Sequence, residues 1–204
     1  MIGTPIRVAE TFVSVQGEGH GPGAGVPMFF VRLQGCSVAR CPIRDACDAE
    51  WRSGTLRTVE SVRIEALASG RRWVCITGGE PLDQAAAVAE LVDGLRQKLV
   101  STMLQTSGAK PWPLLTPRPS WTVVSPKLPA DELEIRQADE VKLVYTGQRA
   151  EEIQSYRAIQ ASAYVLQPFF DGASSNEAAT AVAVLDLGHP WRFGLQAHRY
   201  ARLR

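Results

Sequence analysis

The chain's 204 residues, 45% of them hydrophobic, are enough to bury a core, and its formal net charge of +1 excludes a polybasic nucleic-acid-binding coat or an acidic disordered tail. Residues 1–15 lack the basic flank and long apolar run of a signal peptide. No stretch approaches the roughly 18 apolar residues that a membrane span requires. We therefore expect a cytoplasmic protein with no membrane and no nucleic-acid partner.

Apolar runs of strand length alternate with segments of helical periodicity along the chain. Most of these runs are short and rich in Val, Ile, Leu or aromatic residues, which is typical of buried strands. The predicted strands are residues 28–33, 73–77, 101–105, 122–125, 140–144, 164–167 and 192–196.

Capping residues and apolar stripes predict helices between these strands. Thr58 can cap a first helix that ends at Gly70, and Asp83 can cap a second. Ser174 and Glu177 form a capping box before a third helix, and residues 150–160 form a weaker fourth. The first two stripes are Val59, Val62, Ala66 and Leu67, then Ala85, Val88, Leu91, Val92 and Leu95.

This alternation indicates an α/β fold with parallel strand pairs. The chain is shorter than the about 250 residues of a complete eightfold barrel. We therefore expect a partial, open β/α barrel with a reduced number of helices, in a single domain of residues 1–204. The four prolines of residues 109–121 indicate a loop within that domain rather than a linker.

Three of the four cysteines lie within twelve positions, directly after the predicted strand 28–33: Cys36, Cys41 and Cys47. Clustered cysteines in a chain with no export signal more often bind a metal than form disulfides. Thiolates are the usual ligands of iron–sulfur clusters. Three ligands would leave one iron of a 4Fe–4S cluster open to a cofactor.

A zinc site explains the same cysteines equally well, because zinc also favours sulfur ligands. Its fourth ligand would come from Cys75, His20 or Asp48. Cys75 lies inside the predicted strand 73–77, however, and we expect it to be a buried core residue. The cysteines alone leave the cluster and the zinc site open.

A glycine-rich turn after strand 73–77 favours the cluster. It reads Thr77, Gly78, Gly79, Glu80 and Pro81. Its glycines allow a close backbone approach, and its carbonyl groups and Glu80 can accept hydrogen bonds from an amine. Such a turn placed about thirty residues after a cysteine triad is far more specific than either feature alone.

Six short motifs follow one another along nearly the whole chain: ETFVSVQGEG at 10–19, FVRLQGC at 30–36, TGGEP at 77–81, SPK at 125–127, LQP at 166–168 and LQAHRY at 195–200. In this order they resemble the radical S-adenosylmethionine superfamily and, within it, the 7-carboxy-7-deazaguanine synthase family. The length also resembles this small branch of the superfamily.

The resemblance implies a carbon–nitrogen lyase of deazapurine and queuosine biosynthesis. A reduced 4Fe–4S cluster would cleave S-adenosylmethionine, and the resulting radical would take a hydrogen from C6 of 6-carboxy-5,6,7,8-tetrahydropterin. Ring contraction with loss of ammonia would give 7-carboxy-7-deazaguanine, while the protein binds and orients the partners. The resemblance also implies an external electron donor such as flavodoxin, and a homodimer.

The resemblance assigns site residues by position. The cluster ligands would be Cys36, Cys41 and Cys47. The S-adenosylmethionine site would comprise Gly78, Gly79, Glu80, Ser125, Pro126, Lys127, Gln167 and Pro168. The pterin site would comprise Val15, Gln16, Gly17, Glu18, Arg32, Thr77, His198 and the terminal Arg204. Arg32 would bind the pterin carboxylate, because a guanidinium can do so in a bidentate manner.

The cysteine loop departs from the family pattern in two ways. Four and then five residues separate its cysteines, where the superfamily usually has three and then two, which indicates a lengthened loop. Ala49 stands where the family favours a threonine that can ligate Mg²⁺, so Asp48 is the remaining candidate ligand.

Two alternatives stay open. One is a radical S-adenosylmethionine enzyme that acts on another small heterocycle or activates a protein glycyl site, and the other is a non-catalytic zinc-binding module. The segment 16–19 and Arg32 favour the deazaguanine synthase.

Overall fold

The computed structural model describes residues 3–47, 49, 51–114 and 116–203. Its strands are β1 (Pro5–Gln16), β2 (Val26–Leu33), β3 (Thr55–Thr58), β4 (Trp73–Gly78), β5 (Ser101–Thr106), β6 (Trp121–Val124), β7 (Glu140–Tyr145), β8 (Ala163–Pro168) and β9 (Trp191–Phe193). Its α-helices are α1 (Val59–Ala68), α2 (Ala85–Arg96), α3 (Ala150–Ser155), α4 (Glu177–Leu187) and α5 (Ala197–Tyr200). Short 3₁₀ helices occupy Pro81–Gln84, Ala130–Glu132 and Tyr156–Ala158.

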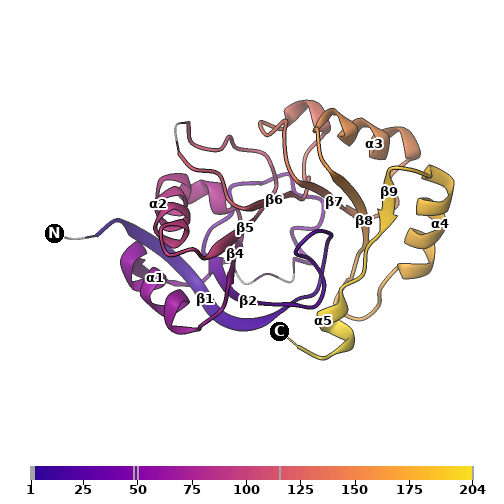
Figure 1. Cartoon of the computed structure of the whole chain (residues 1–204). Helices are drawn as coiled ribbons and strands as arrows, with labels where there is room; N and C mark the ends of the chain where they lie inside the picture. Colours follow the sequence, from indigo (N-terminus) through magenta and orange to yellow (C-terminus); the bar gives the residue numbers. More distant parts are fainter. Residues whose placement is uncertain (1–2, 48, 50, 115, 204) are drawn as a thin grey trace.

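The strands form one open sheet in the order β3-β1-β2-β4-β5-β6-β7-β8-β9. Strand β1 pairs antiparallel with β2 and β3, and all the other pairs are parallel. Figure 1 shows the sheet curving round, with α1 and α2 outside one half and α3 and α4 outside the other. The open sheet confirms the expected partial β/α barrel.

The side chains of the sheet separate into an outer and an inner layer, because successive residues of a strand point to opposite faces. In β2, Val31 and Leu33 belong to the large core that includes the α1 and α2 stripes, whereas Met28 and Phe30 belong to a smaller cluster with Cys75. Val88, Leu91, Val92 and Leu95 of α2 are buried as predicted. Each such side chain stabilises the fold by about 2 kcal/mol through burial.

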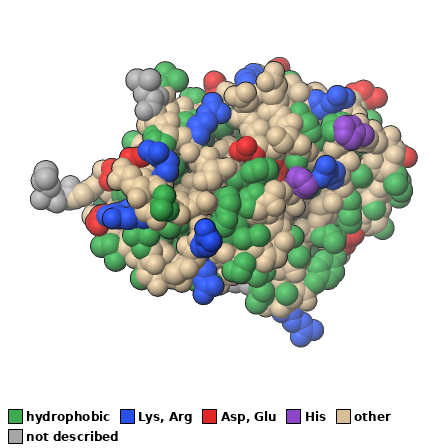
Figure 2. All heavy atoms as spheres, in the orientation of Figure 1, with side chains coloured by type: hydrophobic (Ala, Val, Ile, Leu, Met, Phe, Trp, Pro, Cys, Tyr) green, Lys and Arg blue, Asp and Glu red, His purple; other side chains and the backbone are tan. Residues whose placement is uncertain are grey.

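Polar side chains of the strands face the inner layer. Arg32 alternates with Val31 and Leu33 on β2, and Lys142 alternates with Val141 and Leu143 on β7. The outer layer therefore provides the core, and the inner face is left for a site. On the surface, basic, acidic and apolar side chains are interspersed over the face that Figure 2 shows. No helix among the described residues is long and apolar enough to span a bilayer.

Two of the predicted capping residues do not cap helices. Thr58 does cap α1, where its side chain accepts a hydrogen bond from Ser61 N. The prediction for Asp83 is wrong, because a 3₁₀ helix precedes α2 and the Asp83 carboxylate binds Ser37 instead. The capping box at Ser174 is also wrong, because α4 has Asn176 as its N-cap residue and Ser174 belongs to a turn with Asp171.

Differences in the strands and in α3 follow from local context. The last predicted strand ends at Phe193 rather than at 196, although Gly194 N still donates to Leu166 O of β8, and α5 begins at Ala197. Two strands escaped prediction: β1, whose two faces are both partly exposed, and β3, a polar edge strand. The segment predicted as helix 150–160 forms α3 and then a 3₁₀ turn.

Candidate active site

The inner face of the sheet lines a cavity of about 240 Å³. Most of the predicted site residues lie at its wall: Val15, Gln16, Gly17, Glu18, Arg32, Cys36, Cys41, Cys47, Thr77, Gly78, Gly79, Ser125, Lys127, Gln167, Pro168 and His198. Many of them lie at the carboxyl ends of β2, β4, β6 and β8 or directly after them, because the carboxyl ends of parallel strands meet at one edge of a sheet. Asp48 and Arg204 lie outside the described residues.

The lengthened cysteine loop is organised by consecutive turns. Cys41 N donates to Val38 O at 3.3 Å, and Cys47 N donates to Arg44 O at 3.4 Å. The Arg44 guanidinium donates to Val38 O at 3.1 Å and lies 4.5 Å from the ring centroid of Trp51. The added residues therefore form a folded loop at the cavity wall.

The three cysteines of this loop are half-buried and share one wall of the cavity. Burial raises the pKa of the Cys36 thiol. Among the described residues, no three His, Cys, Asp or Glu side chains stand in metal-binding positions. The three thiols nevertheless open onto one cavity, and thiolates are the donor type that a 4Fe–4S cluster uses.

Two of the candidate fourth ligands for zinc lie elsewhere. Cys75 is completely buried beside Met28 and Phe30, and burial raises its pKa to about 12. The His20 ring lies 3.0 Å from Nη1 of Arg192. The expectation that Cys75 is a core residue is confirmed.

The glycine turn fits tightly against the start of the cysteine loop. A Cβ at Gly79 would lie 1.9 Å from Gly35 O, and a Cβ at Gly78 would lie 2.3 Å from Leu33 O. Gly79 N donates to Leu33 O at 3.2 Å, and Glu80 N donates to Gly35 O at 2.9 Å. Both glycines are needed because two backbones meet here without room for a side chain.

The Glu80 side chain does not line the cavity, although the sequence predicted a cofactor contact. Its carboxylate is 1% exposed and accepts hydrogen bonds from Leu82 N at 3.0 Å, Thr106 Oγ1 at 2.6 Å and Ser107 N at 2.8 Å, and also from Ser107 Oγ. Glu80 therefore fastens the turn after β4 to the end of β5. Pro126, predicted beside Ser125 and Lys127, is buried next to the cavity-lining residues rather than among them.

Asp83 is a site residue that the sequence misassigned. Its carboxylate accepts hydrogen bonds from Ser37 N at 2.8 Å and Ser37 Oγ at 2.6 Å, and Lys110 Nζ lies 2.6 Å away. Burial favours a higher pKa for Asp83, but Lys110 and Ser37 outweigh burial and lower it. Asp83 thus anchors the residue that follows Cys36.

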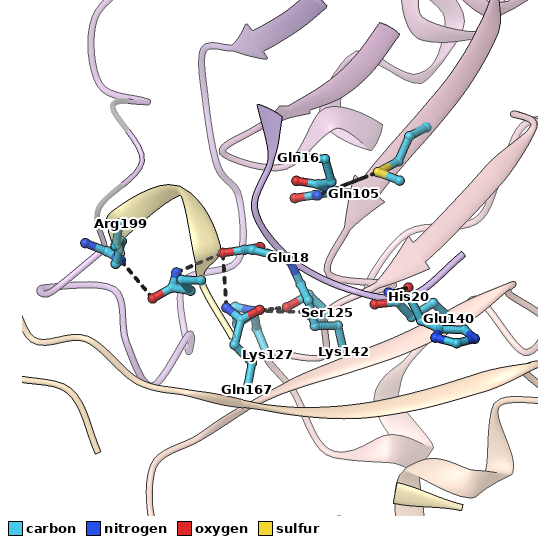
Figure 3. A network of polar contacts seen from close by, with 12 residues as sticks. Gln16, Glu18, His20, Gln105, Ser125, Lys127, Glu140, Lys142, Gln167 and Arg199 are labelled. Atoms are coloured by element: carbon cyan, nitrogen blue, oxygen red, sulfur yellow. Dashed lines mark hydrogen bonds and ion pairs between the residues drawn. The ribbon is translucent and has the colours of Figure 1, made fainter. Parts of the chain in front are cut away.

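Another part of the cavity lining is a network of buried polar side chains (Figure 3). Glu18 forms an ion pair with Lys142, whose side chain is only 5% exposed. The Glu18 Oε1 atom also accepts hydrogen bonds from Gln167 Nε2 at 3.1 Å and Gln196 Nε2 at 2.8 Å. Burial favours a neutral Glu18, but Lys142 and its other partners overcome burial and lower the pKa to about 2.

Lys142, Gln196 and Arg199 are cavity residues that sequence reasoning did not assign. Arg199 Nε donates to Gln196 Oε1 at 2.8 Å, and its guanidinium lies 3.9 Å from the ring centroid of Phe170. One signal was available for Lys142: a lysine in the middle of an apolar predicted strand points inward only if it has a buried partner. Gln196 and Arg199 belong to the motif at 195–200, from which only His198 had been assigned.

Two further polar groups of the cavity are suited to a ligand. Lys127 Nζ donates to Ser125 Oγ at 2.6 Å and to Ser125 O at 2.9 Å, and burial lowers its pKa. The Gln167 Oε1 atom is buried and has no hydrogen-bond partner in the part of the chain that the structure describes. A buried acceptor of this kind fits an N–H donor of a bound molecule.

An aromatic pair forms the floor beside Arg32. The rings of Phe12 and Phe30 stack with centroids 4.9 Å apart, and the Arg32 guanidinium lies 5.7 Å from the Phe12 centroid. Arg32 Nε donates to Glu10 at 2.8 Å, so a ligand carboxylate would use the terminal nitrogens. These residues suit a flat, anionic heterocycle.

The segment after β9 covers one side of the cavity. Ala197 N donates to Gly17 O at 2.7 Å, and a Cβ at Gly17 would lie 2.0 Å from His198 Nδ1. Figure 1 shows α5 beside the end of β1. The close approach of His198 explains the glycine at position 17.

Comparisons with known proteins give the family of this chain. No protein-family model matches the chain. The 7-carboxy-7-deazaguanine synthase of Bacteroides thetaiotaomicron is 34% identical over 202 residues, which cover 97% of this chain and 98% of the relative. The Synechocystis enzyme of the same name is 31% identical over 97% of this chain and 93% of its own. QueE from Escherichia coli superposes with a TM-score of 0.72 at 25% identity and covers 95% of both chains. The chain belongs to the 7-carboxy-7-deazaguanine synthase family.

Proposed function

We propose that this protein is a radical S-adenosylmethionine lyase that converts 6-carboxy-5,6,7,8-tetrahydropterin to 7-carboxy-7-deazaguanine with loss of ammonia. One observation carries the proposal: the cysteine loop, the glycine turn and the polar network face a single cavity, in a chain that matches the named synthases from end to end. The whole chain would act as one domain of deazapurine biosynthesis.

In this proposal Cys36, Cys41 and Cys47 hold the 4Fe–4S cluster. When bound, the cluster and S-adenosylmethionine supply the radical chemistry of the reaction. The chain supplies the shape and polarity of the cofactor site. Gly78 and Gly79 bring backbone groups to it, and further contacts come from Ser125, Lys127, Gln167 and Pro168.

The pterin would bind beside Phe12 and Phe30, with its carboxylate on Arg32. Val15, Gln16, Gly17, Glu18, Thr77 and His198 complete the proposed substrate site. An ionised Glu18 suits the N–H groups of the pterin ring, because a carboxylate only accepts hydrogen bonds. Enclosure by the segment after β9 would exclude water from the reacting ring.

Three further features of the proposal rest on family membership. They are an external electron donor such as flavodoxin, a homodimer, and a Mg²⁺ ion. Ala49 lines the cavity and its side chain brings no oxygen ligand, so Mg²⁺ would depend on Asp48 or on other oxygen donors. Comparing turnover with and without added Mg²⁺ tests that dependence.

Anaerobic turnover with mass identification of the product tests the function. Protein reconstituted with iron and sulfide is supplied with a reductant, S-adenosylmethionine and the carboxytetrahydropterin, and we expect 7-carboxy-7-deazaguanine. Cleavage of S-adenosylmethionine without this product would point to another substrate. If anaerobic preparations contain zinc but neither iron nor acid-labile sulfide, that result would support a zinc-binding module.

A cysteine variant tests the ligand set within the same assay. Cys41→Ala is expected to lose cluster retention and turnover, because only two of the proposed thiolates remain. Cys75→Ala is the matched control, since Cys75 is buried away from the cavity and should leave the iron content unchanged. Full iron content and activity in Cys41→Ala would contradict the ligand assignment.

A further inference from the structure

Lys142 is a buried cation that the proposed substrate and cofactor contacts do not use. It lies in the middle of β7 and points to the inner face of the sheet, with a side chain 5% exposed. Its ion-pair partner is Glu18, which follows β1 in the connection to β2. A buried ammonium group is costly unless a counter-charge and hydrogen bonds compensate it, so the pair has to be held together.

The pairing of Lys142 is selective. A second carboxylate on the same strand, Glu140, is fully buried and accepts a hydrogen bond from His20 N at 2.8 Å. Burial raises the pKa of Glu140, and no ion pair joins Glu140 to Lys142 among the described residues. The titratable groups that face the pair are Glu140 and Cys75 on the Lys142 side, His198 on the Glu18 side, and Lys127, which interacts with both. Glu18 is left as the counter-ion of Lys142.

Glu18 in turn accepts hydrogen bonds from two other parts of the chain. Lys142 occupies Oε2, which leaves Oε1 to accept from Gln167 of β8 and from Gln196 at 2.8 Å. Gln196 then accepts from Arg199, which stacks on Phe170. The carboxylate is thus the junction between the inner sheet face and the segment of residues 194–203, here called the C-terminal segment (Figure 3).

The orientation of this junction depends on charge. Glu18 Oε1 accepts from both amide nitrogens only while it is held toward them, and the ammonium on Oε2 fixes that rotamer. With a neutral side chain at 142, burial favours a protonated Glu18. A protonated carboxyl group has less acceptor capacity, and its O–H competes for the same space.

We infer that Lys142 is a positioning residue for the proposed reaction: its ammonium group orients the Glu18 carboxylate, and through Gln196 it anchors the C-terminal segment over the cavity. The expected effect of Lys142 on turnover rests on the proposed function. The anchoring itself is a property of the chain alone.

Hydrogen exchange on the protein without cofactors tests the anchoring. In Lys142→Met, exchange of peptides from the C-terminal segment, including Ala197 N–H, is expected to be about tenfold faster or more. Lys142→Arg should keep the exchange within about twofold of wild type, because it preserves the charge. Lys98→Met, in the exposed turn after α2, is the control for loss of a lysine. Unchanged exchange in folded Lys142→Met would overturn the inference.

Turnover kinetics test the consequence. Lys142→Met is expected to raise KM for the pterin about tenfold or more and to add an acidic limb to the pH profile of kcat/KM, with partial rescue in Lys142→Arg. If the variants show the expected differences in exchange but the wild-type protein makes no deazaguanine, the proposed function is contradicted and the anchoring is not. If Lys142→Met does not fold, Glu18→Gln decides, because an amide has one acceptor oxygen and cannot accept from both the ammonium group and the two glutamine amides. Wild-type exchange in Glu18→Gln would overturn the inference.

Discussion

The two sides of the cavity are held in different ways. One side, the cysteine wall, consists of residues 35–47 with the turn 77–83, and backbone groups fasten it: Gly35 O accepts from Glu80 N, and no Cβ fits at Gly79. The other side, the polar wall, consists of Glu18, Lys142, Gln167 and Gln196, and charged and amide side chains fasten it.

This difference matches what each wall is proposed to hold. A cluster needs ligands at fixed positions, and backbone contacts provide them with little freedom to move. A polar substrate needs hydrogen-bond donors and acceptors, and a network of charged and amide side chains provides them. The cysteine wall should therefore respond mainly to changes of shape, and the polar wall to changes of charge.

The largest expected effect is on the shape of the cysteine wall. Gly79→Ala places a Cβ 1.9 Å from Gly35 O, and neither backbone can withdraw without breaking the hydrogen bond between Glu80 and Gly35. We expect a loss of about 4 kcal/mol in the free energy of unfolding, measured by urea denaturation, and loss of cluster retention.

Gly3→Ala is the matched control for Gly79→Ala. The added Cβ would lie 3.5 Å from Thr58 Cβ, which is an ordinary contact. The control should stay within about 0.5 kcal/mol of wild type. If both variants were equally stable, the close contact between the two backbones would not hold the cysteine wall.

The next effect is on the charge of the polar wall. The pKa of Glu18 is lowered from 4.5 to about 2, so its stabilising contribution is present above about pH 5 and is lost as the pH falls toward 2. The contribution at neutral pH is about 3 kcal/mol. Urea denaturation of wild type and Glu18→Gln at a series of pH values measures it. The stability gap between them should shrink below pH 5, and a gap independent of pH would refute the assignment.

A smaller effect is expected where charge supports the cysteine wall. Glu80→Gln replaces one carboxylate oxygen by an NH₂ group, which would face the donors of either Thr106 or Ser107 at a residue that is 1% exposed. We expect a loss of about 2 kcal/mol in the free energy of unfolding. Glu90→Gln on α2, an exposed partner of Thr4, should cost less than about 0.5 kcal/mol. Equal costs for the two variants would mean that the Glu80 network does not hold the turn.

The smallest effect is expected at Asp83. The ion pair between Asp83 and Lys110 is partly exposed, so Asp83→Asn should cost about 1 kcal/mol or less in global stability. Its local effect should be larger: faster hydrogen exchange at Ser37 N–H, because Asp83 accepts that bond. Asp93→Asn, in a surface pair with Arg96, is the control. Unchanged exchange at Ser37 would show that Asp83 does not anchor the cysteine loop.

Local sequence patterns predicted much of the fold, because the periodicity of apolar residues within a segment determines which of its faces can be buried. The apolar run of β4 and the stripe of α2 predicted both elements, since burial of each depends on its own periodicity. Strand β1 was missed because residues 9–12 in its middle are partly buried on both faces, which weakens the alternation that predicts a strand. The capping prediction for Asp83 failed because a carboxylate binds the donor that tertiary structure brings to it, here Ser37, 46 positions away.

The sequence by itself determined the cysteine triad, the glycine turn and their placement after parallel strands, because short motifs encode ligand chemistry and close backbone approach. Only the tertiary structure decided which polar side chains meet across the cavity. Glu18, Lys142 and Gln196 come from segments more than 120 and 50 positions apart along the chain. No local pattern encodes such a meeting, since the cost of burying each charge is met only by the partner that the fold supplies.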